Sequence, residues 1–275
     1  MPSLLQLALG LEGLSLLRGW PMMGDPEIAQ RVDDLRALVE APLESFEVPE
    51  RDVLAGYAAW AETYDRPGNP VIQIEQLVVQ ELLAGIPKGR VLDAACGTGR
   101  HAAYLASLGH QVVAVDTTFE MLRRVPVAPV CRGDLQALPL ASQSFGGAVC
   151  SLALTHCPDL GPPVAELARV LRPGGTLVLS DIHPCAVLLG TQAFYRGADG
   201  NPGFVRNYMH PAGAYLLAFQ KAGLEVCELI EPTFRPEHAL FLLTGVFRRF
   251  PHLKGPMESA IDGVPAIAIW HLRRA

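Results

Sequence analysis

The chain has 275 residues, of which 50% are hydrophobic and 18% are charged, so it can bury a sizeable core and is not globally disordered. Its 22 basic and 28 acidic side chains give a formal net charge of -6. This balance argues against a phosphate backbone as the main partner, because such binding draws on clustered Lys and Arg. Six cysteines without a C-x-x-C pair indicate reduced thiols in a cytoplasmic protein.

The N-terminal part favours helices. Apolar residues recur at helical spacing in residues 27–41, and residues 1–20 are also expected to be helical. The apolar start lacks a basic region, contains Glu12 and is too short to cross a bilayer, so a docking helix is favoured over a signal peptide. We expect a helical extension or lid at residues 1–55, before a second part at residues 56–275. This extension is also a candidate contact for a homo-oligomer.

Two more helices are expected before the first buried strand, at residues 49–65 and 71–84. In the first of them, Tyr57, Trp60 and Tyr64 recur at a spacing that places them on one helix face. Core packing is the favoured role for Trp60.

From Arg90 onward, short apolar strands alternate with helices. The expected strands are residues 90–95, 111–116, 129–134, 145–154, 176–182, 224–232 and 265–274. The expected helices between them are residues 99–109, 118–125 and 164–172, with a further helical segment around 236–250. Such alternation predicts an α/β fold with a parallel sheet that is covered on both faces.

Residues 184–212 stand out as a long, glycine-rich and aromatic insertion after the fifth strand. Long irregular segments in compact domains usually cover active sites. We therefore expect this segment to shape the pocket of an acceptor molecule, with Tyr195, Arg206 and Tyr208 as candidates, together with Tyr57 from upstream.

A turn of small residues, "AACGTGRH", follows the first strand at residues 94–101. Glycines at such a turn let backbone N–H groups approach a ligand and present a helix N-terminus to it. Asp116 ends the second strand 19 residues after Gly97, where a carboxylate accepts hydrogen bonds from a ribose diol.

Two further landmarks follow at similar intervals. Asp134 ends the third strand, where its carboxylate can bind the exocyclic amine of adenine, and Leu135 offers a backbone N–H to the ring. The sharp "LRPGG" turn at residues 171–175 precedes the fifth strand, and a dinucleotide-binding fold does not need it.

Together these residues resemble the class I S-adenosylmethionine-dependent methyltransferases, over about residues 56–275. The family pattern is an acidic residue followed by three glycines at alternate positions. Asp93, Gly97 and Gly99 match it, while Ala95 replaces the first glycine at a place where we expect the backbone to need none. The resemblance implies a Rossmann-like, doubly wound, seven-stranded, mostly parallel sheet with one late antiparallel strand, and methyl transfer from S-adenosylmethionine bound over the strand ends.

The resemblance also implies the cofactor contacts. Asp93 would orient the glycine loop and the amino-acid end of the cofactor, Asp116 would hold the ribose, and Met121 would line the adenine. Tyr64 would close over the methionine end. The full expected set is Tyr64, Asp93, Ala95, Gly97, Gly99, Asp116, Thr117, Met121, Asp134, Leu135 and Ser151.

Two other readings of the glycine turn stay open. An NAD-dependent oxidoreductase is possible in principle because Ala102 occupies the third glycine position of the dinucleotide pattern, where alanine is sometimes tolerated. A protein that binds S-adenosylmethionine without methylating, as a regulator or partner subunit, is the other alternative. The aromatic insertion argues against it, since a pure binder needs no acceptor pocket.

His156 and His183 are the candidate catalytic residues, because they follow the fourth and fifth strands, near the expected position of the reacting methyl group. His183, with Asp181 expected to back it, is a candidate general base. A loop-fixing role is favoured for His156.

The sequence shows no metal constellation, so no metal is expected, and the N-P-P-Y pattern of amino-group methylation is absent. With the acidic charge, this disfavours nucleic acid, and no membrane association is expected. The chain looks like natural-product methyltransferases, which implies a small, largely apolar or aromatic acceptor such as a phenol or an indole, methylated on O, N or C.

Overall fold

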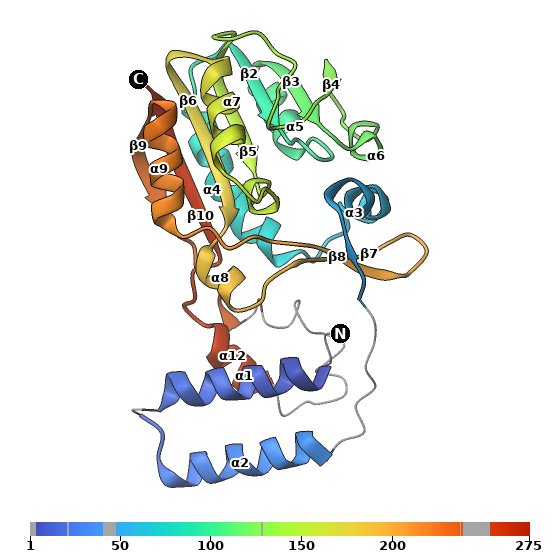
Figure 1. The fold of residues 1–275 in the computed structure, drawn as a ribbon, viewed down its shortest axis with the longest axis vertical. Helices are drawn as coiled ribbons and strands as arrows, with labels where there is room; N and C mark the ends of the chain where they lie inside the picture. The colour runs from blue at the N-terminus through green and yellow to red at the C-terminus, as the bar shows by residue number, and fades with distance from the viewer. Residues whose placement is uncertain (1–3, 21, 41–47, 128, 237, 239–253) are drawn as a thin grey trace. The chain divides into compact units, whose positions relative to one another are not determined.

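A computed structural model describes residues 4–20, 22–40, 48–127, 129–236, 238 and 254–275 (Figure 1). The chain divides into two compact units. One contains Met1–Pro49, Gly68–Pro70 and Thr233–Val264. The other contains Glu50–Pro67, Val71–Pro232 and Pro265–Ala275.

The larger unit is built on a seven-stranded sheet in the order β4-β3-β2-β5-β6-β10-β9. Its strands are β2 (Arg90–Ala94), β3 (Gln111–Asp116), β4 (Val130–Arg132), β5 (Phe145–Ser151), β6 (Leu171–Ile182), β9 (Leu224–Ile230) and β10 (Ile267–Arg274). Only β10 among them runs antiparallel to its neighbours β6 and β9. The predicted doubly wound, mostly parallel sheet with one late antiparallel strand is confirmed.

The sheet reverses its direction of growth between β2 and β5. The chain runs from β2 outward through β3 to β4, then returns to β5 on the other side of β2. In open α/β sheets, ligands bind at this switch point, outside the carboxyl ends of the strands. The topology therefore predicts where the site lies.

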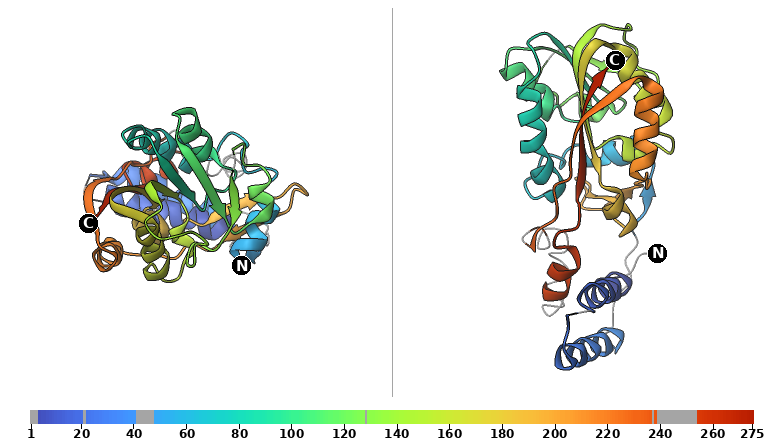
Figure 2. Two further views of the ribbon diagram at one scale, coloured as in Figure 1. Left: turned by 90° about the horizontal axis from the view of Figure 1, so that it is seen from above. Right: turned by 90° about the vertical axis from the view of Figure 1, so that its left-hand side faces the viewer.

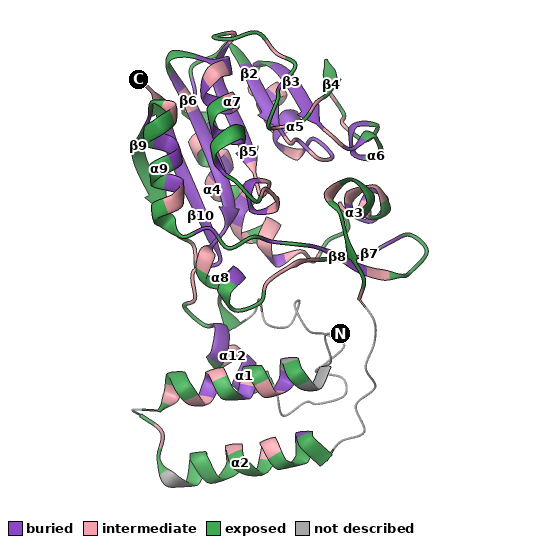
Figure 3. Ribbon diagram, viewed as in Figure 1, coloured by how far each residue is buried: buried purple, intermediate pink, exposed green. Residues whose placement is uncertain are grey.

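Helices cover both faces of this sheet. Figure 2 (right) shows α4 (Pro70–Ala84) and α5 (Arg100–Ser107) on one face, and α7 (Gly161–Val170) and α9 (Ala212–Ala222) on the other. The short α6 (Phe119–Leu122) and η1 (Leu154–His156) follow β3 and β5. The inner strands are almost wholly buried, as Figure 3 shows, because apolar residues on both strand faces meet a helix layer.

The "RPGG" turn is accommodated as a loop inside the β5–β6 ladder. Phe145 pairs with Leu171 and Gly147 with Thr176, so four residues of β6 have no counterpart on β5. Gly174 takes a φ of 74° there, a left-handed conformation that favours glycine.

The segment after β6 is more regular than predicted. It forms α8 (Pro184–Leu188) and the antiparallel hairpin β7 (Ala193–Arg196) and β8 (Pro202–Val205). The two-residue strand β1 (Glu50–Arg51), which the sequence analysis missed, adds to β8 in parallel and leads into α3 (Val53–Trp60). Aromatic and β-branched residues such as Phe194 and Val205 make this segment a sheet, where its glycines had suggested an irregular loop.

The smaller unit contains α1 (Leu4–Gly19), α2 (Asp25–Glu40) and α12 (Lys254–Ile261). The Arg18 guanidinium donates to the carbonyls of Ala260 and Asp262 at 2.7 and 2.6 Å, which fixes the end of α1 to the end of α12. The helix expected around residues 236–250 lies almost wholly outside the described residues. The assignment of residues 1–55 to a lid or an oligomer contact stays a prediction.

Candidate functional site

The turn after β2 is held by the acidic residue that precedes it. Asp93 is 2% exposed, and its Oδ2 accepts a hydrogen bond of 2.7 Å from the N–H of Ala102 in the first turn of α5. Burial raises the pKa of Asp93 to about 7. Arg100 and this hydrogen bond stabilise the ionised carboxylate and so work in the opposite direction. Asp93 therefore ties α5 to β2 from behind the loop.

Three residues of the turn have left-handed backbones. Ala95 has a φ of 52°, Gly97 of 55° and Gly99 of 85°. The expectation that position 95 needs no glycine is wrong, because in this conformation the Cβ of an L residue lies too close to the following carbonyl oxygen. A Cβ on Gly99 would lie 2.8 Å from the Val125 side chain, so this glycine is required by packing. A Cβ on Gly97 would meet open space, which is where a ligand approaches the loop.

The left-handed backbone of Ala95 leads to a stability prediction. Ala95→Gly is expected to raise the free energy of unfolding by about 1 kcal/mol, because glycine adopts a positive φ without steric cost. Gly223 provides the mirror control, since it caps α9 with a φ of 68° and open space around its Cα. Gly223→Ala should lower stability by a similar amount in urea unfolding. An Ala95→Gly variant that is clearly less stable than wild type would contradict this view of the loop.

Asp116 joins the second strand to the glycine loop. Its Oδ2 accepts the N–H of Gly97 and its Oδ1 accepts the N–H of Thr118, both at 2.8 Å. Burial raises its pKa, and these backbone donors work in the opposite direction. Asp116 also lines the cavity described next, so its carboxylate faces the space that a ligand would occupy.

A cavity of 270 Å³ lies over the carboxyl ends of β2, β3, β4 and β5. Ten of the predicted residues line it: Tyr57, Tyr64, Ala95, Gly97, Asp116, Thr117, Asp134, Leu135, Ser151 and His156. Asp93, Gly99 and Met121 are not among its lining residues and are buried behind it. The sequence analysis missed Val53 and Leu54, which α3 contributes, and Gln136, Leu138 and Leu152.

The lining residues fit S-adenosylmethionine. Open space above Gly97 gives room for a ligand at the loop, and Asp116 offers carboxylate lone pairs beside it. The Ser151 hydroxyl at the end of β5 is buried without a hydrogen-bond partner among the described residues, although it lines the cavity. An orphaned buried hydroxyl is costly unless a ligand satisfies it.

Tyr57 and Tyr64, which line this cavity, belong to a cluster of aromatic rings. The α3 helix ends at Trp60, so Tyr64 does not share one helix face with Tyr57 as predicted. The rings still gather, with centroids 5.7 Å apart for Tyr57 and Trp60 and 5.0 Å apart for Trp60 and Tyr64. Tyr195 stacks on Trp60 at 5.6 Å and does not line either of the two cavities described, so it supports the wall from outside.

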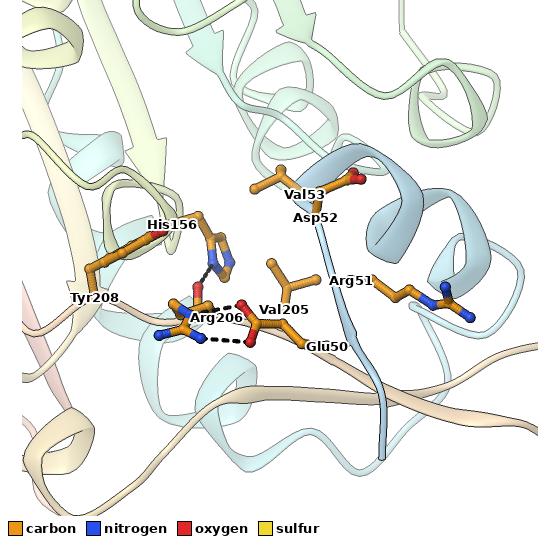
Figure 4. Close-up of a pocket in the computed structure, with 8 residues that line it drawn as sticks. All are labelled: Glu50, Arg51, Asp52, Val53, His156, Val205, Arg206 and Tyr208. Atoms are coloured by element: carbon orange, nitrogen blue, oxygen red, sulfur yellow. Dashed lines mark hydrogen bonds and ion pairs between the residues drawn. The ribbon is translucent and has the colours of Figure 1, made fainter. Parts of the chain in front are cut away.

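His156 is the histidine at the cavity. Its Nδ1 lies 2.8 Å from the carbonyl oxygen of Arg206 (Figure 4). Its Nε2 lies 2.7 Å from the Tyr57 hydroxyl. A carbonyl only accepts, so Nδ1 carries the proton and the Nε2 lone pair accepts from Tyr57. Burial lowers the pKa of His156, which keeps the imidazole neutral, and burial raises the pKa of Tyr57, which keeps the phenol protonated.

His183 lies elsewhere. Its Nδ1 accepts the N–H of Cys185, which caps α8, and its Nε2 is 2.8 Å from the Glu231 carboxylate. It is not among the lining residues of either cavity. Asp181 does not back it, because that carboxylate binds Tyr215. Both ring nitrogens of His183 are therefore engaged in hydrogen bonds within the chain, and a catalytic role for this residue stays a prediction.

Asp181 instead supports the turn that carries His156. It is fully buried, its Oδ2 accepts the Tyr215 hydroxyl at 2.7 Å, and it accepts the backbone N–H of Thr155. Burial raises its pKa to about 7, while these donors lower it. The same turn is held from outside, because the Tyr208 N–H donates to the Thr155 carbonyl and His210 Nε2 donates to the Cys157 carbonyl, each at 2.7 Å.

The buried carboxyl of Asp181 predicts a pH dependence of stability. Because its folded-state pKa lies above the value of about 3.9 in unfolded chains, its contribution to stability is complete below that value and is lost as the pH rises through about 7. Asp181→Asn should therefore make the free energy of unfolding fall less steeply between pH 4 and 8. The part of the fall that is due to Asp93 should remain. Urea unfolding at several pH values measures this, and an unchanged slope would contradict the burial argument.

A further buried carboxylate, which no sequence pattern singled out, lies next to the start of α5. Glu75 of α4 accepts from Arg100 at 2.5 Å and from the Ser180 hydroxyl at 2.7 Å, and lies 3.3 Å from His101. Desolvation alone would raise its pKa, but Arg100 and His101 together lower it. Glu75 thus links α4, the start of α5 and the end of β6.

The described residues contain no group of three or more His, Cys, Asp and Glu side chains arranged to hold a metal ion. In the same part of the chain, no helix has the length and apolar character needed to cross a membrane.

The model of the family described as "Methyltransferase domain" matches residues 92–179, which run from β2 to β6. The chain is 34% identical over 139 residues to a malonyl-[acyl-carrier protein] O-methyltransferase of Pseudescherichia vulneris, covering 49% of this chain and 55% of that protein. It is 38% identical over 112 residues to a demethylmenaquinone methyltransferase of Renibacterium salmoninarum, covering 39% and 47%. The chain thus spans about half the length of the curated relatives it matches.

Solved structures share the fold at lower identity. An S-adenosylmethionine-dependent methyltransferase from Mesorhizobium loti superposes with a TM-score of 0.53 at 21% identity, over 73% of this chain and 98% of that one. The [4+2]-cyclase SpnF superposes with a TM-score of 0.56 at 18% identity, over 83% and 99%. Residues 92–179 therefore match a methyltransferase domain, and the fold of the chain is that of the class I S-adenosylmethionine-dependent methyltransferases.

Proposed function

We propose that this chain transfers a methyl group from S-adenosylmethionine to a small acceptor whose reacting group is still protonated when the acceptor binds. The observation that carries the proposal is the Tyr57–His156 pair in the wall of the glycine-loop cavity. A neutral imidazole whose Nε2 lone pair accepts from a protonated phenol is suited to receive a proton that the phenol relays from an acceptor.

The cofactor would be held by the residues at the strand ends. Asp116 is placed to bind the ribose hydroxyls, Asp134 and Leu135 to bind the adenine, and the Ser151 hydroxyl to bind the amino-acid end. When bound, the cofactor supplies a methyl group that its sulfonium sulfur makes electrophilic. The protein residues need to align the acceptor, exclude water and remove a proton.

Proton removal would run through both members of the pair. Tyr57 donates to His156 Nε2, so its oxygen can accept a hydrogen bond from an acceptor O–H at the same time. As the acceptor oxygen bonded to the methyl carbon and the carbon–sulfur bond broke, the acceptor O–H bond would break and a new Tyr57 O–H bond would form. The original Tyr57 proton would move to His156 Nε2, the imidazole would become an imidazolium, and the demethylated thioether would leave.

The lining supports an acceptor whose reacting end is apolar or aromatic. Leu54, Leu138 and Leu152 line the cavity beside Tyr57, and this is the kind of wall that encloses an aromatic ring. An alcohol or phenol is the favoured acceptor, since the pair handles an O–H proton and a relative from Pyrenophora dematioidea, 31% identical over 148 residues, is named an O-methyltransferase. Indoles and amines remain as alternatives, and a role in secondary metabolism belongs to the same proposal.

Two measurements test this function in sequence. Calorimetric titration with S-adenosylhomocysteine should give one site per chain. Methyl-labelled S-adenosylmethionine should then pass its label to members of a panel of phenols, alcohols, indoles and amines, with phenols or alcohols preferred. Cofactor binding without labelling of any panel member would favour a protein that binds the cofactor without methylating, and binding of NAD in its place would favour an oxidoreductase.

A further inference from the structure

A second cavity adjoins the cofactor cavity at His156. It has a volume of 450 Å³ and is lined by Glu50, Asp52 and Val53 on the β1–α3 segment, by Val205 at the end of β8, and by Arg206 and Tyr208 after it. Arg51 and His156 complete the lining. Val53 and His156 are the two residues that both cavities share. A molecule that presents its reacting group to Tyr57 and His156 would extend into this outer cavity.

The charges in this outer cavity are already matched to each other. Glu50 Oε1 and Oε2 accept from Nε and an Nη of Arg206, both at 2.7 Å, in the bidentate arrangement of a strong ion pair (Figure 4). The pair lowers the pKa of Glu50 and raises that of Arg206. A second anion would therefore have to compete with Glu50 for the same guanidinium.

The other two charged residues do not offer a free cation. The Asp52 carboxylate accepts the N–H of Ala55 at 2.8 Å and so caps α3. Figure 4 shows the Arg51 side chain extending away from the other seven lining residues. An anionic group that leaves water for this cavity would meet two carboxylates, a guanidinium already paired with Glu50, and Arg51, whose side chain extends away, which is unfavourable.

From this balance we infer that the outer cavity binds the non-reacting part of an uncharged polar acceptor, and that Glu50 determines this specificity by masking Arg206. The inference rests on the proposed function and names its substrate class: a hydroxylated molecule whose far end carries a neutral polar group such as an ester, an amide or a hydroxyl. Tyr208 and the ion pair supply hydrogen bonds to such a group, and Val53 and Val205 supply apolar contact.

The test compares the binding of two probes of similar shape and different charge to the protein loaded with S-adenosylhomocysteine. Methyl 4-hydroxybenzoate is neutral, and 4-hydroxybenzoate carries a carboxylate at the same end. Wild type should bind the ester more tightly. Glu50→Gln removes the masking carboxylate while the backbone pairing of β1 with β8 remains, and it should raise the affinity for the carboxylate relative to the ester about tenfold, since charged hydrogen bonds contribute on that scale.

Arg206 supplies the matched control. In the Glu50→Gln, Arg206→Gln double variant the gain for the carboxylate should disappear, because the unmasked cation is gone. Both side chains are about half exposed, at 42% and 55%, so these substitutions are compatible with folding. Thermal unfolding checks this directly for each variant.

Three results would overturn the inference: tighter binding of the carboxylate by wild type, an unchanged ratio in Glu50→Gln, or binding of neither probe by a protein that still binds S-adenosylhomocysteine. If wild type does not bind S-adenosylhomocysteine at all, the proposed function itself is contradicted, and this outcome is distinct from the three above.

Discussion

Asp116→Ala is expected to lower the affinity for S-adenosylhomocysteine about a hundredfold. The Asp116 carboxylate accepts the N–H groups of Gly97 and Thr118 and is also the acceptor offered to the ligand's ribose. Its removal leaves the Gly97 and Thr118 donors without a partner and removes the hydrogen bonds to the ribose. Hydrogen bonds to charged groups contribute about 1.5–3 kcal/mol each, so we expect a loss of about 3 kcal/mol of binding free energy. Calorimetric titration measures the change.

Asp159 offers a matched control for this variant. Its Oδ1 accepts the N–H of Gly161 at 2.8 Å, the same kind of contact as Asp116 with Gly97, but it does not line the cofactor cavity. Asp159→Ala should change the affinity less than about twofold if the effect at Asp116 is specific. Equal losses in both variants would show that the Asp116 effect is a general loss of loop structure.

The second large effect is expected at the Tyr57–His156 pair. Tyr57→Phe and His156→Gln should each lower kcat about a hundredfold with a smaller change in cofactor affinity, because proton removal by a positioned group contributes about 10²–10⁴-fold. If the two residues act as one unit, the double variant should be little slower than either single variant. Additive losses would contradict the relay, since independent residues multiply their effects.

The pH profile distinguishes proton transfer from loop fixing. His156 must be neutral to accept a proton, and burial lowers its pKa, so the acid limb of kcat/KM should lie below about pH 6.5, the ordinary value for histidine. His156→Gln should remove this limb. His210→Gln loosens the same turn, because His210 holds the Cys157 carbonyl, but it should keep the limb. A limb that survives in His156→Gln would assign the titration to another group.

Much of the fold was predictable because its signals are local. Apolar strands that alternate with helices led to the parallel sheet, and the spacing of acidic residues led to Asp116 and Asp134, while the family resemblance added Ser151. These residues end parallel strands, so their convergence follows from the topology alone. The resemblance to a family then added the number of strands and the one late antiparallel strand, which is β10.

The roles of the two histidines depended on distant partners. His183 meets Glu231, 48 residues away, and the carbonyl that sets the tautomer of His156 comes from Arg206, 50 residues away. No spacing rule encodes such contacts, and the nearby Asp181 was the wrong partner to choose for His183. The two-residue strand β1 was equally invisible, because so short a strand has no periodicity and forms only through its pairing with β8.

The most direct test of the account is methyl transfer by wild type and Tyr57→Phe, compared under saturating methyl-labelled S-adenosylmethionine and a neutral hydroxylated acceptor from the panel. The account predicts label on the acceptor oxygen with wild type, and a rate about a hundredfold lower with Tyr57→Phe at similar cofactor affinity. Equal rates with the two proteins, or bound cofactor that never gives up its label to any acceptor, would contradict it.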